Sequence, residues 1–118
     1  MSKKVWARGW EFEDDFINQY SLLYLDYIRQ KNCCVSGSNI SEPHHLKAVG
    51  MGNNRDNPMA EHFTTVPLSR AMHTEVHNMG IFPFMTKYQI NLWEESHYYL
   101  IGFLVKEDLL FVLKEIES

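Results

Sequence analysis

The sequence predicts one α+β domain, in which a short two-stranded hairpin and a helix are flanked by helical segments at both ends. Three observations support this fold class. Apolar residues near the N-terminus have helical spacing, the middle of the chain has turn-rich and β-branched segments, and the C-terminal third is largely apolar. With 118 residues, 45% hydrophobic and 22% charged, the chain is long enough for one compact core. We expect a single domain over residues 1–118, with an N-terminal helical segment (1–32), a core (33–80) and a C-terminal helical segment (81–118).

Composition and charge exclude several classes of protein. The chain has no apolar run of about 18 residues and no apolar segment after its N-terminal lysines, so we expect no membrane span and no signal peptide. A cytoplasmic location follows as an expectation. The two cysteines, Cys33 and Cys34, are neighbours and rarely fit disulfide geometry, so we expect core residues instead of a disulfide-stapled scaffold. The net charge of -4 argues mildly against a generic nucleic-acid coat.

The N-terminal segment predicts a helix from Glu11 to about Lys31. Acidic residues begin it and basic residues end it, which complements the helix dipole. Apolar residues recur within it at steps of four, four, three and four, which is the spacing of one helical face. That predicted inward face comprises Phe12, Phe16, Tyr20, Leu23 and Tyr27.

The middle segment contains two short β-type runs and then a helix. "HHLKAV" and "HFTTVPL" are predicted strands, separated by Gly- and Asn-rich loop sequence. The following helix has Ser69 as a plausible N-cap and Gly80 as a plausible C-terminal stop. Its predicted inward face comprises Met72, Val76 and Met79, at steps of four and three.

The C-terminal segment predicts two further helices. Thr86 could cap the first, through "KYQINLWEESHYYL", and "KEDLLFVLKEIE" predicts the last. Between them "YYLIGFLV" is compatible with a helix or with a buried strand, and periodicity leaves both open.

Histidines concentrate in the middle segment and predict a metal site. His73 and His77 stand four residues apart on the predicted helix, so their rings lie on one face and can chelate one ion. His44 and His45 are neighbours on a predicted strand and point to opposite faces, so only one of them can join that ion. The other is a candidate general base, because a neutral imidazole accepts a proton near physiological pH. Three histidine ligands also leave a coordination position open for a phosphate oxygen.

The stretch "PHHLKAVGMGNNRDNPMAEHFTTVPLSRAMHTEVHNMG", Pro43 to Gly80, resembles the HNH endonuclease motif of the ββα-metal (His-Me finger) superfamily, and most of all the phage-type HNH nucleases. The "KYQINLW" segment that follows is also similar. The resemblance implies a ββα-metal finger that hydrolyses phosphodiester bonds in DNA with one divalent ion, Mg, Mn or Zn. It implies His45 as the general base and, as metal ligands, His44, His73 and His77.

The sequence also departs from the family pattern. Ser36, Ser69 and Met72 stand where many members carry cysteines of zinc knuckles, so we expect no structural zinc. The middle motif position, usually Asn or Asp, falls on His62 or on Thr64, and either could hold the base in place.

The resemblance implies DNA as the partner, in phage DNA processing, recombination or packaging inside a bacterial host. Lys47, Arg55 and Arg70 are candidate DNA contacts, and a homodimer is possible. Two other classes of function stay open. One is a catalytically inactive ββα-metal module that binds DNA or a partner protein, and the other is a metal-free structural adaptor.

Overall fold

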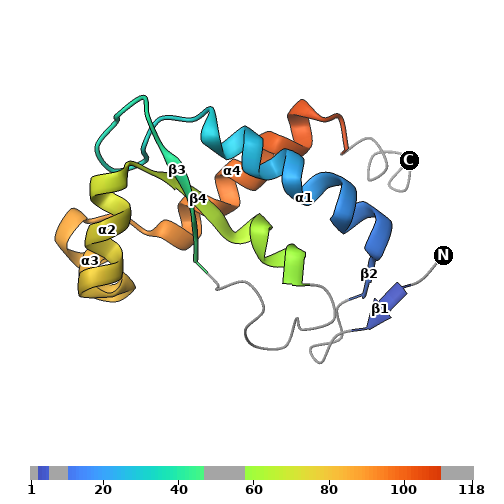
Figure 1. Ribbon diagram of the computed structural model, residues 1–118, viewed down its shortest axis with the longest axis horizontal. Coiled ribbons are helices and arrows are strands. Elements are labelled where there is room, and N and C mark those ends of the chain that lie inside the picture. The colour runs from blue at the N-terminus through green and yellow to red at the C-terminus, as the bar shows by residue number, and fades with distance from the viewer. Residues whose placement is uncertain (1–2, 6–10, 47–57, 110–118) are drawn as a thin grey trace.

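A computed structural model describes residues 3–5, 11–46 and 58–109 of the chain, and they form the predicted α+β fold (Figure 1). Within these residues there are four α-helices, one 3₁₀ helix and two separate two-stranded antiparallel sheets. No helix among them is long and apolar enough to cross a membrane. The elements in chain order are β1 (Lys3–Val5), β2 (Glu11–Glu13), α1 (Asp14–Arg29), β3 (Glu42–His45), η1 (Pro58–Thr64), β4 (Thr65–Leu68), α2 (Arg70–Met79), α3 (Ile81–Tyr88) and α4 (Leu92–Lys106).

Helix α1 begins later than predicted and buries a different stripe. Its first three predicted residues form β2 instead, which pairs with β1. Leu23, predicted to face inward, is 44% exposed, because the buried stripe runs one residue further round the helix. Tyr27 is buried and Tyr20 half-buried as predicted, whereas the side chains of Phe12 and Phe16 lie outside the described part. The buried positions of α1 are Ile17, Ser21, Tyr24, Leu25, Tyr27 and Ile28.

Strands β3 and β4 form the small sheet on which the histidines lie. They pair antiparallel, with His44 opposite Val66 and His45 opposite Thr65. The strand predicted from His62 begins only at Thr65, because the preceding residues form the 3₁₀ helix η1. The hydroxyls of Thr64 and Thr65 each donate to the carbonyl oxygen three residues earlier, at 2.7 and 2.8 Å, which favours this tight turn. Residues 47–49 of the other predicted strand lie outside the described part.

Helix α2 confirms its sequence prediction. The Ser69 hydroxyl accepts a hydrogen bond from the backbone N–H of Met72, and Ser69 is therefore the N-cap. Gly80 ends the helix with φ 89°, a conformation that a side chain would disfavour, and its N–H donates to the carbonyl of Val76. Val76 is buried, and Met72 and Met79 pack against the same cluster.

The C-terminal helices have different boundaries from those predicted. Thr86 is not an N-cap, because it lies inside α3 and its hydroxyl donates to the carbonyl of Phe82 at 3.1 Å. The break comes at Gln89, in the left-handed region with φ 52°, and Asn91 caps α4 by accepting from the N–H of Glu94. The ambiguous "YYLIGFLV" is helical. Of the predicted last helix, Lys106 ends α4, residues 107–109 form a turn, and residues 110–117 lie outside the described part.

Two apolar clusters hold the small sheet in place. One lies between α1 and α4 and centres on Tyr24, Tyr27, Ile28 and Phe103. In Figure 1 the strands β3 and β4 lie between α2 and α3 on the left and α1 and η1 on the right. Cys34 is half-buried, and buried Cys33 belongs to the second cluster, as expected for core cysteines. The second cluster comprises Cys33, Val66, Leu68, Val76, Phe84 and Leu92.

Candidate metal centre and histidine pair

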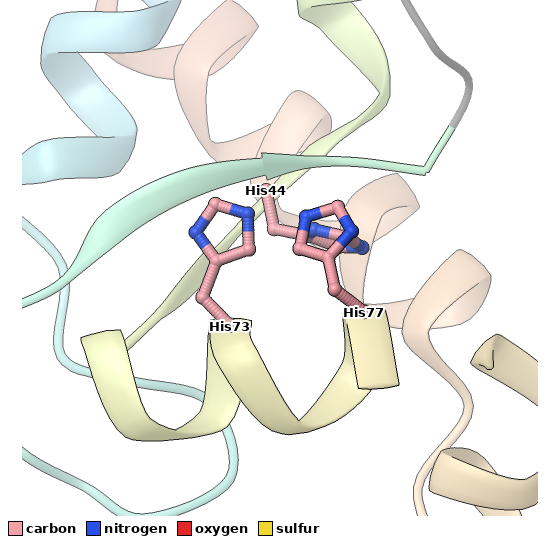
Figure 2. A group of neighbouring side chains, drawn as sticks. All are labelled: His44, His73 and His77. Atoms are coloured by element: carbon pink, nitrogen blue, oxygen red, sulfur yellow. The ribbon is translucent and has the colours of Figure 1, made fainter. Parts of the chain in front are cut away.

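Three histidines predicted as metal ligands converge between β3 and α2. Figure 2 shows His73 and His77 rising from α2 toward the strand that carries His44. One ring nitrogen from each residue can be chosen so that all three lie within 4.8 Å of one another. The ring centroids of His44 are 4.8 Å from His73 and 5.2 Å from His77, and the two helical rings are 4.8 Å apart. Among the described residues, these three histidines form the one group of three or more His, Cys, Asp or Glu side chains that could hold a metal ion.

Local structure explains the convergence. The spacing of four residues puts His73 and His77 one turn apart on α2, with rings inclined by only 29°. Alternation along β3 turns His44 toward that helix. The cap at Ser69 fixes where α2 begins, and buried Val76 holds the helix against the sheet. The two elements therefore position the rings before any ion binds.

His44 has the electrostatics of a neutral ligand. Its side chain is 7% exposed, and its Nδ1 atom has no hydrogen-bond partner in the described part of the chain. Burial, followed by the neighbouring rings of His73 and His77, lowers the pKa of His44 to about 4. The ring is therefore uncharged at neutral pH, with a lone pair available on one of its two nitrogens. A buried unpaired nitrogen costs about 1–3 kcal/mol, so a cation among the three rings fits this donor set.

Glu42 contacts the candidate metal site from the same strand, and the sequence reasoning missed it. Its Oε1 lies 2.6 Å from Nδ1 of His73, and its Oε2 lies 3.5 Å from the guanidinium of Arg70. With Nδ1 donating to the carboxylate, the lone pair of His73 remains on Nε2 for a metal ion. The signal was available, because Glu42 precedes His44 by two residues and so shares its face of the strand.

His45 lies on the other side of β3 and pairs with His62. Its Nε2 is 2.8 Å from Nδ1 of His62, and the ring centroids are 5.1 Å apart. One of these two nitrogens must donate and the other accept, so a single proton lies between them. The Thr65 hydroxyl donates to the carbonyl of His62 at 2.8 Å, whereas the Thr64 hydroxyl donates to that of Glu61. Of the two candidates for the middle motif position, His62 is the one whose imidazole contacts His45.

The environment of this pair disfavours the protonated form of both rings. Burial lowers the pKa of His45, with smaller contributions from His62 and His73. Burial also lowers the pKa of His62, and the nearby Arg29 guanidinium adds to the effect. Both directions preserve the form that accepts a proton.

Of the candidate DNA contacts, only Arg70 lies among the described residues. Its side chain is 85% exposed at the start of α2 and lies 3.5 Å from Glu42, the residue that bonds to His73. Lys47 and Arg55 lie outside the described residues. His97 is exposed on α4, in neither histidine group. The expected lack of a structural zinc stays a prediction.

Comparison with known proteins gives one match. The family model described as "Protein of unknown function (DUF968)" matches residues 17–98, which includes both histidine groups. No curated protein and no solved structure matches the chain.

Proposed function

The chain belongs to the DUF968 family of proteins of unknown function, and we propose from its own histidine sites that it is a metal-dependent DNA endonuclease of the ββα-metal type. The observation that carries the proposal is that the two histidine groups lie on opposite sides of β3. Three convergent rings lie on the α2 side, and the pair of His45 and His62 lies on the other.

His44, His73 and His77 are the proposed metal ligands. When bound, a divalent ion there would hold a non-bridging phosphate oxygen and offset charge that develops on the leaving oxygen. All-nitrogen ligation suits borderline ions such as Zn, whereas Mg or Mn, which prefer oxygen ligands, is the proposed ion in the cell. Glu42 keeps the Nδ1 atom of His73 occupied, so that the ring presents its other nitrogen.

His45 is the proposed general base. If its Nε2–H donates to Nδ1 of His62, the lone pair of His45 lies on Nδ1, where it can accept a proton from water. The same bond orients the ring and stabilises the positive charge that the ring gains. His62 therefore acts as a positioning residue that takes the place of the usual Asn or Asp of the motif.

DNA is the proposed substrate, on three grounds. The sequence resembles HNH endonucleases, and the paired sites suit hydrolysis of a phosphodiester. Exposed Arg70 pairs with Glu42, which bonds to the proposed ligand His73, and from there it can contact a flanking phosphate. The phage-type resemblance extends the proposal to phage DNA processing, recombination or packaging in the cytoplasm of a bacterial host.

The test is cleavage of supercoiled plasmid with Mn²⁺ or Mg²⁺. We expect nicked or linear product from the wild type, loss of product with EDTA, and loss with His45→Ala although metal still binds. His97→Ala is the matched control, because it removes an exposed imidazole outside both groups and should leave cleavage unchanged. Intact plasmid under every condition, with metal bound, would contradict the nuclease and favour a module that only binds DNA or protein. Failure of the wild type to bind metal would favour the structural adaptor.

A further inference from the structure

The pair of His45 and His62 has the ring spacing of the candidate metal centre. Its ring centroids are 5.1 Å apart, and the three centroid distances at that centre are 4.8, 4.8 and 5.2 Å. Two nitrogens that bind one tetrahedral ion, each about 2.0–2.1 Å from it, are about 3.3 Å apart. Nε2 of His45 and Nδ1 of His62 are 2.8 Å apart, so turning the rings to separate these atoms by about 0.5 Å would admit an ion.

Both rings of the pair can supply a lone pair to an ion. Burial lowers the pKa of His45 and of His62, which favours the uncharged form that binds metals. The two residues are only half-buried, so an ion can reach them from solvent. Because neighbouring residues of β3 point to opposite faces, an ion at this pair would be separate from one bound by His44.

The surroundings of the pair make it the weaker of the two sites. After burial, the Arg29 guanidinium contributes to the lowered pKa of His62, so its positive charge also opposes a cation there. Asp26 lies 2.8 Å from that guanidinium and offsets part of its charge. Loss of an outer-shell partner alone typically weakens metal binding about 10- to 100-fold, so a site with two rings instead of three should bind at least about 100-fold more weakly.

We propose that His45 and His62 form a second, weaker site for a borderline transition-metal ion such as Zn²⁺. The ion takes lone pairs from Nε2 of His45 and Nδ1 of His62, and water completes its coordination. The proton that lay between these atoms moves through water to the other nitrogen of the ring that donated it, so the pair loses no proton. The His45 ring then carries the metal on one nitrogen and a proton on the other.

An ion at the pair therefore blocks the proposed general base. With both nitrogens of His45 occupied, the ring has no lone pair to accept a proton from water. Excess Zn²⁺ should then stop cleavage, and this consequence rests on the proposed function. Binding of the second ion does not depend on activity.

Equilibrium dialysis of the chelator-treated full chain against increasing Zn²⁺ tests the second site. We expect a second ion to bind at free Zn²⁺ at least about 100-fold above the first. His62→Ala should weaken the second ion by at least about tenfold and leave the first unchanged, whereas His73→Ala should weaken the first. His97→Ala is the matched control, because it removes an imidazole outside both groups and should leave both ions in place.

Two measurements place the second ion at the pair. Arg29→Gln removes the positive charge near His62 and frees Asp26, so the second ion should bind about two- to threefold more tightly while the first is unchanged. Imidazole nitrogen NMR should show its largest shifts on addition of the second ion at Nε2 of His45 and Nδ1 of His62. Circular dichroism confirms that each variant folds.

Three outcomes would overturn the proposal. They are a wild type that binds no second ion, a second ion indifferent to both His62→Ala and Arg29→Gln, and nitrogen shifts that fall on other rings. Plasmid cleavage that persists with the second ion bound would overturn the block of the base. A wild type that never cleaves plasmid, yet binds the second ion at these two nitrogens, would contradict the nuclease and support the second site.

Discussion

Replacing Glu42 by alanine tests how the proposed metal centre is organised. The carboxylate accepts a 2.6 Å hydrogen bond from Nδ1 of His73, and without it that ring is free to rotate and to change tautomer. Loss of such a support typically weakens metal binding 10- to 100-fold, or by about 1.4–2.7 kcal/mol. Glu42 is 33% exposed and shares its charge with Arg70 at 3.5 Å, so water and the arginine already weaken its hold on the ring. We therefore expect a loss close to tenfold.

The assay is titration of chelator-treated protein with Zn²⁺ against a chromophoric competitor. Glu42→Gln keeps an oxygen acceptor for Nδ1 of His73 and should lose only about threefold. Glu75→Ala is the matched control, because Glu75 lies on α2 but bonds to Lys87 and Tyr88 on α3. If Glu42→Ala binds Zn²⁺ within twofold of the wild type while its fold is unchanged, the carboxylate does not organise the ligand, and our account of the site is wrong.

Three further predictions concern stability. Zn²⁺ at about 100 times its dissociation constant should stabilise the wild type by about 2.7 kcal/mol in thermal melts, and the gain should disappear in His73→Ala but persist in His97→Ala. The pKa of buried His44 is about 4 in the folded chain and near 6.5 in the unfolded chain. The free energy of unfolding of the metal-free protein should therefore fall by at most about 3 kcal/mol as the pH falls from about 6.5 to about 4, and His44→Gln should flatten that dependence. A Cβ at Gly102 would lie 2.5 Å from the Tyr27 hydroxyl, and α1 holds Tyr27 in the core. Gly102→Ala should therefore lower the free energy of unfolding, measured with denaturant, by about 1–3 kcal/mol. An unchanged midpoint of unfolding would contradict this packing.

Helix α2 was the most predictable part of the fold because its signals are local. A capping serine, a stopping glycine and apolar residues at helical spacing all lie within twelve residues, and the structure confirms each. The convergence of His73 and His77 follows from the same local geometry. Their convergence with His44 also depends on β3, which is distant in the sequence. The resemblance to the ordered HNH motif, rather than any local signal, predicted that contact.

The wrong predictions concern element boundaries that tertiary contacts or competing N-caps determine. Thr86 and Asn91 are both plausible N-caps, and the chain uses Asn91 because the Thr86 hydroxyl bonds back to the helix that contains it. The run before β4 has the β-branched composition of a strand, yet Thr64 and Thr65 close a 3₁₀ turn there. That turn brings the His62 ring to His45, so the error in secondary structure and the ambiguity about the middle motif position share one cause.

A strand is suited to separate the two roles proposed for the neighbouring histidines of β3. Consecutive side chains project to opposite faces, so His44 can join α2 only if His45 points away from it toward η1. A ring bound to a metal ion cannot also accept a proton through the same lone pair, and the separation keeps the second ring free to do so. Inserting one residue between His45 and the loop would leave this division intact. Inserting one between Glu42 and His44 would move the carboxylate to the other face, so the support of His73 should fail before the convergence of the ligands does.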